Sequence, residues 1–197
     1  LSGSWGIGHT RWATHGMVTD LNAHPFYGNR NKVAAVHNGI IENFQQLRAD
    51  LQKEGVEFSS ETDSEVIPNL VEKHYSGNLL DAVQKALNEV IGTYALAITC
   101  VDEPDKIVVA KRGGPLVIGL SDNAYYIASD VNAIVGNTTR VIYLENGDIV
   151  EVTKDGLKFP NVINNDYAKR VEEITINAHE TEKCGYETYM EKEINEQ

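Results

Sequence analysis

Apolar residues in the first half of the chain recur at the spacing expected of helices. In three stretches they return every three or four positions, so each stretch has one apolar face. These stretches are residues 40–55, 59–77 and 79–90. In the second, Thr62 and Glu65 have the spacing of a capping box, and Pro68 fits only within the first turns of a helix.

Alternation of apolar and polar residues predicts strands on either side of these helices. Two short strands come first, at residues 5–12 and 32–37, and Asn38-Gly39 is expected to turn from strand to helix. From residue 92 onward, short alternating runs separated by turn residues predict antiparallel strands. The last pair is expected to form a hairpin around Asn146-Gly147.

The order of these elements, two strands, three helices and a run of strands, is typical of an α+β layered domain. The sequence contains neither a G-x-G-x-x-G motif nor a P-loop, which argues against a doubly wound nucleotide-binding fold. A chain of 197 residues with 42% hydrophobic content is sufficient for one such domain with a tail.

Composition narrows the function classes. The net charge of -12 disfavours nucleic acids and anionic membrane surfaces as partners. No apolar run is long enough to span a bilayer, and the first residues lack the features of a signal peptide. With two cysteines and no metal-ligand spacing of His or Cys, we expect a cytoplasmic protein with no metal site and no cofactor.

Arg11 and Asp63 are candidates for holding the two charges of an amino acid. An arginine beside a glycine-rich loop can bind a carboxylate through two parallel hydrogen bonds, and an aspartate can receive an ammonium. Each has an ordinary alternative: a surface ion pair for Arg11 and a helix cap for Asp63. The sequence alone does not show that the two residues meet.

Asn38 and Gly39 are candidates for an oxyanion hole. A side-chain amide followed by an unhindered backbone N–H offers two donors to a developing negative charge. The ordinary alternative is a turn pair selected for its tolerance of positive φ.

The histidines and cysteines divide by position. His9 and His37 lie in predicted strands and are expected to be core or half-buried, whereas His15 and His24 lie in a loop and can line a site. Cys100 reads as a small core residue. The other cysteine, Cys184, has no evident base beside it, so neither resembles an activated thiolate.

Several segments, taken in chain order, resemble the glutaminase domain of class II amidotransferases. These segments are GHTRWATHG (8–16), NAHP (22–25), HNGIIEN (37–43) and SETDSEVI (60–67). Within that family, the tryptophan of TRWATHG and the phrase HNGIIENFQQLR resemble the isomerising glutamine–fructose-6-phosphate aminotransferases. Further similar segments are GGPLVIGL (113–120), AYYIASD (124–130) and GYETYMEKEINEQ (185–197).

The resemblance implies a fold and a set of roles. The fold would be a four-layer α/β/β/α sandwich of two antiparallel sheets, of the N-terminal-nucleophile hydrolase type. Arg11 would hold the α-carboxylate of L-glutamine and Asp63 its α-amine, while Asn38 and Gly39 would form the oxyanion hole. The other residues implied to contact substrate or line its pocket are Trp12, Thr14, His15 and His24. Trp12 would gate the exit of ammonia.

The resemblance also implies how the chain is divided into domains. Residues 1–160 would form the glutaminase domain, and residues 161–197 would lead to a sugar isomerase domain that binds fructose 6-phosphate, in a homodimeric enzyme. The family's N-terminal cysteine nucleophile and first strands have no counterpart here, because the chain begins LSGSWGIG. We therefore expect this chain to lack its N-terminal segment and to be inactive in glutamine hydrolysis.

Two alternatives stay open on the sequence. Another class II amidotransferase, such as the phosphoribosylamine-forming enzyme or asparagine synthetase, would use the same glutamine chemistry with a different acceptor. A glutamine-binding module without catalysis would also keep these residues.

Overall fold

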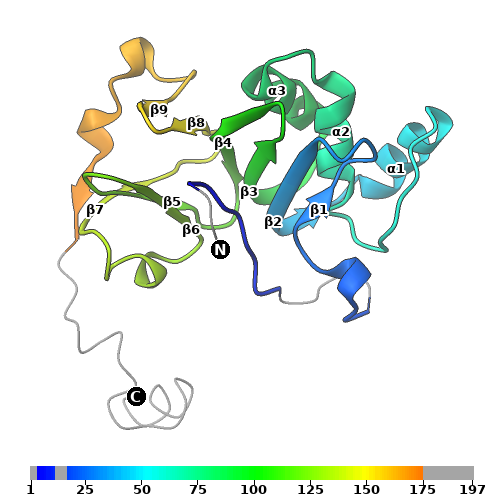
Figure 1. Cartoon of the computed structure of the whole chain (residues 1–197), viewed down its shortest axis with the longest axis horizontal. Helices are drawn as coiled ribbons and strands as arrows, with labels where there is room; N and C mark the ends of the chain where they lie inside the picture. The colour runs from blue at the N-terminus through cyan, green and yellow to red at the C-terminus, as the bar shows by residue number, and fades with distance from the viewer. Residues whose placement is uncertain (1–3, 12–16, 175–197) are drawn as a thin grey trace, which may run out of the picture.

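Two antiparallel sheets face each other in the computed structural model of the protein, which describes residues 4–11 and 17–174 (Figure 1). The six-stranded sheet has the order β1-β2-β3-β4-β8-β9. Its strands are β1 (Phe26–Tyr27), β2 (Val33–Ile41), β3 (Gly92–Cys100), β4 (Glu103–Arg112), β8 (Ile149–Thr153) and β9 (Gly156–Lys158). The four-stranded sheet has the order β10-β7-β5-β6. Its strands are β10 (Glu172–Glu173), β7 (Arg140–Tyr143), β5 (Val117–Leu120) and β6 (Tyr125–Ala128).

Three α-helices of the described chain cover one face of the six-stranded sheet (Figure 1). They are α1 (Phe44–Lys53), α2 (Val66–His74) and α3 (Leu79–Glu89). Short 3-10 turns lie at Asp20–Asn22, Val131–Ala133, Ile163–Asn165 and Tyr167–Arg170. The three predicted helices are thus confirmed, although α1 and α2 begin later in the chain than the sequence pattern predicts. Pro68 is the third residue of α2, where its missing N–H costs no helical hydrogen bond.

Because side chains alternate along each strand, the six-stranded sheet contributes to a separate hydrophobic core on each of its two faces. In β4, Val108 and Ala110 pack under the helices, whereas Ile107 and Val109 face the second sheet. The second sheet contributes Ile118 and Ile142 to this inner core. The outer face of the second sheet is covered by the 3-10 turn at Val131–Ala133 and the loop that follows it. The predicted sandwich of two antiparallel sheets is confirmed.

Residues 4–11 alternate as predicted but pair with no strand of the described chain. Trp5 and Ile7 turn toward the core between the sheets, while Ser4, Gly6 and Gly8, which alternate with them, are exposed. Side-chain burial without a ladder partner explains why the period of a strand is present and the strand itself is not.

The predicted turn at Asn38-Gly39 is wrong, because β2 continues through both residues to Ile41. Their partners on β3 are Ala95 and Tyr94. Gly39 has φ +137°, and a Cβ there would lie 2.2 Å from the backbone oxygen of Thr93. Glycine is therefore required by a close strand-to-strand approach and an unusual φ, rather than by a reversal of the chain.

The capping box predicted for α2 is also absent. Glu65 instead turns backward, and its two carboxylate oxygens accept hydrogen bonds from the backbone and hydroxyl groups of Ser59 and Ser60 at 2.6–2.9 Å. The spacing that suggested a cap therefore serves to hold the loop before the helix.

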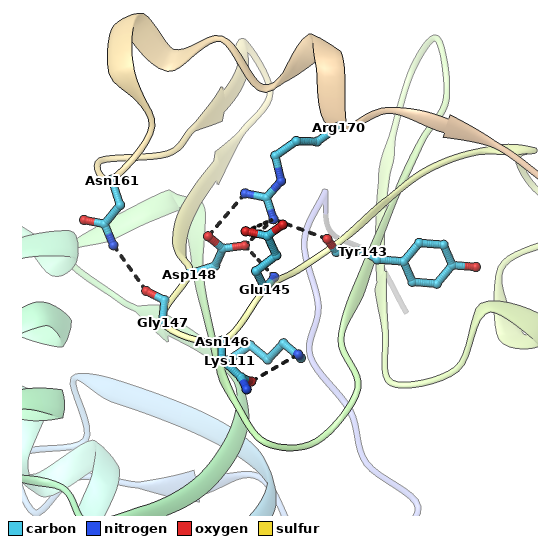
Figure 2. A network of polar contacts seen from close by, with 8 residues as sticks. All are labelled: Lys111, Tyr143, Glu145, Asn146, Gly147, Asp148, Asn161 and Arg170. Atoms are coloured by element: carbon cyan, nitrogen blue, oxygen red, sulfur yellow. Dashed lines mark hydrogen bonds and ion pairs between the residues drawn. The ribbon is translucent and has the colours of Figure 1, made fainter.

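The predicted hairpin around Asn146-Gly147 is wrong, since β7 and β8 belong to different sheets. The turn carries the chain from one sheet to the other, and Figure 2 shows the polar network around it. Arg170 binds Asp148 through both terminal guanidinium nitrogens, at 3.2 and 2.5 Å, and also donates to the carbonyl oxygen of Tyr143. This network ties residues 161–174 to the crossing between the sheets.

None of the helices in the described residues has the length and apolar character needed to cross a membrane. The same residues contain no group of three or more His, Cys, Asp or Glu side chains arranged to hold a metal ion.

Candidate functional site

Near the end of β2, one of its edges has no strand partner among the described residues and is called the open edge here. In an antiparallel ladder, successive residues turn their N–H groups to opposite edges. The N–H of Glu42 donates to Ile91 beside β3, whereas the carbonyl of Val33 accepts from Gly28 on the β1 side. Odd-numbered residues of β2 therefore face the β1 side. In the described chain, β1 pairs with this edge only at Ala34 and Ala35.

The carboxylate of Asp63 occupies this open edge. Its Oδ2 accepts a hydrogen bond from the N–H of Ile41 at 2.7 Å, and the side chain is buried, with 2% of the residue exposed. The next N–H along the same edge belongs to Gly39, two residues away, which corresponds to about 7 Å. A negative charge and a backbone donor are thus placed side by side on one edge.

The loop that carries Asp63 is held by its own polar groups. Besides the bonds from Glu65, the hydroxyl of Ser60 lies 2.9 Å from that of Thr62. Glu65 and Ser60 are both buried. Since every one of these groups has a partner, the loop gives Asp63 a fixed position.

His37 joins this loop to β3 from beneath the strand. Its Nδ1 lies 2.8 Å from the hydroxyl of Ser64, and its Nε2 lies 3.3 Å from the carbonyl oxygen of Thr93. Burial lowers the pKa of His37, against the opposing effects of Asp63 and the Thr93 carbonyl, so the ring is neutral at pH 7.

Asn38 projects from the opposite face of β2, toward the segment of residues 4–11. Its Oδ1 lies 2.8 Å from Nε2 of His9, and Asn38 itself is exposed. The ring of His9 also accepts, at Nδ1, the N–H of Arg11 at 2.8 Å. The guanidinium of Arg11 donates to the carbonyl oxygen of Met17 at 3.3 Å.

His24 completes the group. Its ring packs against that of His9 at a tilt of 35°, with centroids 4.1 Å apart, and meets Phe26 edge-on at 4.6 Å. Both ring nitrogens are buried without a hydrogen-bond partner among the described residues. Burial, together with His9, His37 and Arg11, lowers the pKa of His24 to about 3, so the ring is neutral. It can form a wall of the site without adding charge.

A cavity of about 540 Å³ lies between the sheets next to this group. It is lined by residues 4–10, by the inner face of β2 to β4, and by β6 with the residues after it. Asn38 and His9 border it, whereas Arg11 and Asp63 do not. The cavity therefore meets the candidate site only at its Asn38 end.

The structure brings several of the proposed residues together. Asn38, Gly39 and Asp63 share the end of β2, while Arg11 and His24 approach it through His9. Trp12, Thr14 and His15 lie outside the described residues. Sequence reasoning gave His9 and Ser64 no role in the site and assigned Glu65 to a helix cap. The position of His9 in an alternating run with Trp5 and Ile7 nevertheless indicates that it faces inward.

The cysteine of the described chain is remote from this group. Cys100 is buried and pairs with Val33, five residues along the strand from the Ala95–Asn38 pair, which corresponds to about 17 Å. It is a core residue, as predicted.

Comparisons with known proteins agree with the family resemblance seen in the sequence. A model of the glutamine amidotransferase domain matches residues 9–136. Glutamine–fructose-6-phosphate aminotransferases (isomerizing) from Clostridium perfringens and Clostridium acetobutylicum are each 49% identical over all 197 residues, which span 32% of those proteins. The enzyme of that name from Thermotoga maritima is 45% identical over 191 residues, 97% of this chain and 32% of its own length. The chain thus spans about a third of these curated relatives.

A solved structure supports the fold. Glutamine phosphoribosylpyrophosphate amidotransferase from B. subtilis, in complex with ADP and GMP, matches with a TM-score of 0.64 and 28% identity. The match covers 86% of this chain and 34% of that one. Since the family model covers well over half of the chain, the resemblance seen in the sequence is confirmed, and the chain belongs to the glutamine amidotransferase domain family.

Proposed function

We propose that the chain binds L-glutamine along the open edge of β2, as the glutamine-handling part of a glutamine–fructose-6-phosphate aminotransferase. One observation carries this proposal: the buried carboxylate of Asp63 binds the N–H of Ile41, and the N–H of Gly39 lies two residues from Ile41 on the same edge of β2. The carbon chain of glutamine separates its ammonium from its side-chain carbonyl by a comparable distance.

Asp63 would receive the α-ammonium group. Its carboxylate has one oxygen bound to Ile41, and the long 3.4 Å contact of the other with Ser64 leaves acceptor capacity for the ammonium. Because the carboxylate is buried, the attraction is weakly screened by water and salt. Arg11 would bind the α-carboxylate from the other side.

Asn38 and Gly39 would bind the side-chain carbonyl oxygen of glutamine. The amide nitrogen of Asn38 and the N–H of Gly39 are donors of the kind that stabilise the negative charge of a tetrahedral intermediate. Trp12, Thr14 and His15 would add contacts to glutamine, Trp12 as a gate for ammonia, and His24 would form a neutral wall. The donor pair is supported by the exposure of both residues.

We propose that residues 1–197 alone bind glutamine without hydrolysing it. Cys100 is buried at the far end of β3, and Cys184 does not match the family's catalytic position. In the complete domain, an N-terminal cysteine would attack the amide carbon and release ammonia.

The remaining parts of the proposal concern the whole enzyme. Residues 1–160 would be the glutaminase domain, and residues 161–197 would lead to the domain that binds fructose 6-phosphate. A homodimer and a cytoplasmic setting belong to the same proposal. The link to fructose 6-phosphate is supported by the identity of this chain to enzymes named for that sugar phosphate.

Isothermal titration calorimetry with two ligands tests the ammonium site. L-Glutamine carries the α-amine, and glutaramic acid is the same molecule without it. We expect Asp63→Asn to weaken glutamine binding by at least about 30-fold, roughly 2 kcal/mol, since a buried charge partner is lost. The affinity for glutaramic acid should change far less, because that ligand has no ammonium group to bind the carboxylate.

The matched control is Asp102→Asn, which removes an exposed carboxylate paired with Lys32. It should leave both affinities unchanged. Equal losses for the two ligands in Asp63→Asn would contradict the assignment of Asp63. Glutamate release by the 197-residue chain, abolished by a thiol reagent, would contradict the proposal that this chain does not hydrolyse glutamine.

A further inference from the structure

His9 lies between the two halves of the proposed site, and both of its ring nitrogens are used. Nδ1 accepts the backbone N–H of Arg11 at 2.8 Å, and Nε2 lies 2.8 Å from Oδ1 of Asn38. One face of the ring stacks on His24. The imidazole is therefore held in one orientation by contacts in three directions.

These contacts select one tautomer of the neutral ring. A backbone N–H can only donate, so Nδ1 of His9 must present a lone pair to Arg11. In the neutral ring the proton then lies on Nε2, which donates to Oδ1 of Asn38. The other tautomer would set an N–H against the N–H of Arg11.

The side-chain amide of Asn38 depends on this choice. Asn38 is exposed, and in the described chain its amide makes no hydrogen bond other than the one with His9. An exchange of its oxygen and nitrogen would place NH₂ against the Nε2–H of His9. With Oδ1 held by His9, the NH₂ group is the end that remains for a ligand.

We propose that His9 is a positioning residue that fixes the donor end of Asn38 and the turn that presents Arg11. Arg11 has φ +52°, which few residues other than glycine adopt. The bond from its N–H to the His9 ring closes this turn in the manner of an Asx turn. One neutral ring thereby sets both the oxyanion donor and the carboxylate clamp. The link to glutamine rests on the proposed function, whereas the tautomer and the orientation of Asn38 do not.

Nuclear magnetic resonance of the 197-residue protein without ligand tests the tautomer. Long-range ¹H–¹⁵N correlations distinguish a proton on Nδ1 from one on Nε2. At neutral pH we expect His9 to carry its proton on Nε2. We also expect an order parameter near about 0.85 for the Asn38 side-chain amide, as in rigid backbone. A protonated Nδ1, or an amide order parameter below about 0.6, would overturn the proposal.

Two variants separate the two nitrogens. His9→Gln places an amide nitrogen near the position of Nε2, whereas His9→Asn places an acceptor near Nδ1 but falls short of Asn38. We expect the order of Asn38 to persist in the first variant and to fall below about 0.6 in the second. His74→Asn, at a histidine that pairs with Glu89, is the control and should leave Asn38 unchanged.

Equal order of Asn38 in the two His9 variants would refute the positioning role. If His9→Asn does not fold, the wild-type tautomer and the His9→Gln variant still decide the question. Titration with L-glutamine adds a second readout. We expect His9→Asn to bind about fivefold more weakly, the loss of one oriented hydrogen bond, and His9→Gln to stay within about twofold. Unchanged affinity in His9→Asn would remove His9 from the site. If even the wild type does not bind glutamine, the proposed function fails while the tautomer result stands.

Discussion

Two polar regions of this molecule use similar side chains to opposite effect. At the crossing between the sheets, the guanidinium of Arg170 and the carboxylate of Asp148 bind each other directly, with 19% and 10% of their side chains exposed (Figure 2). At the end of β2, Asn38 is exposed, and the buried nitrogens of His24 have no partner among the described residues.

The difference indicates that the first region contributes to the stability of the fold and the second to the recognition of a ligand. The Arg170–Asp148 network satisfies its charges internally, so a ligand would have to break it. Among the described residues, the site at β2 leaves the NH₂ group of Asn38 and the ring nitrogens of His24 without partners. Second residues such as His9 and Glu65 hold Asn38 and the loop of Asp63 in place. Changes at the network should therefore affect unfolding, and changes at the site should affect glutamine binding.

The largest effect on stability is expected for Arg170→Ala. The change leaves the carboxylate of Asp148 without its cation and removes the contact of Arg170 with the ring of Phe159. We expect the free energy of unfolding to fall by about 3 kcal/mol, measured by urea denaturation, with no change in glutamine affinity. Lys169→Ala removes an exposed neighbour and serves as control. Equal urea midpoints for the two variants would show that the network contributes nothing.

Gly39→Ala should affect both stability and binding. The added Cβ would lie 2.2 Å from the backbone oxygen of Thr93, and the alanine would have to adopt φ +137°. We expect a loss of roughly 2–3 kcal/mol in unfolding free energy, together with weaker glutamine binding. Gly55→Ala has positive φ but open space, so it measures the conformational cost alone. If the two variants unfold at the same urea concentration, the close approach to Thr93 is not what requires glycine.

A smaller effect is expected for Glu65→Gln. The amide keeps one oxygen as acceptor but loses the charge that holds Ser59 and Ser60. Unfolding free energy should fall by about 1–2 kcal/mol. Calorimetry should also show weaker glutamine binding, since this loop carries Asp63. Normal binding with reduced stability would mean that Glu65 supports the fold without positioning Asp63.

The last expected effect is a pH dependence set by His24. Its pKa falls from 6.5 to about 3 on folding, so between these values the unfolded chain binds a proton that the folded chain does not. Stability from this residue is complete above pH 6.5 and is lost as the pH falls toward 3. His24→Phe lacks the titration, so it should lose less stability than the wild type between pH 7 and 5 in urea denaturation. Parallel losses in both proteins would contradict this account.

Sequence patterns predicted the elements better than their connections. The periods of α3 and of the strands from β3 to β8 depend on local side-chain alternation, and these predictions were confirmed. The turns at Asn38-Gly39 and Asn146-Gly147 were misjudged, because the same dipeptide serves hairpins, strand ends and crossings between sheets. Only long-range pairing decides among those uses.

The candidate site shows the same limit. Asn38, Gly39 and Asp63 were identified by their chemistry and by family resemblance, while their meeting on one edge of β2 required the fold. His9 was missed because its importance lies in which nitrogen faces Arg11 and which faces Asn38. No spacing rule encodes that choice.

The most direct test of the central claim is a ¹H–¹⁵N titration of the protein with L-glutamine, because one spectrum observes both regions. We predict saturable shifts at the Gly39 N–H, the Asn38 side-chain amide and Arg11, with Asp148 and Arg170 unchanged. Shifts confined to the Arg170–Asp148 network, or no saturable shift at the end of β2, would contradict the assignment of the glutamine site.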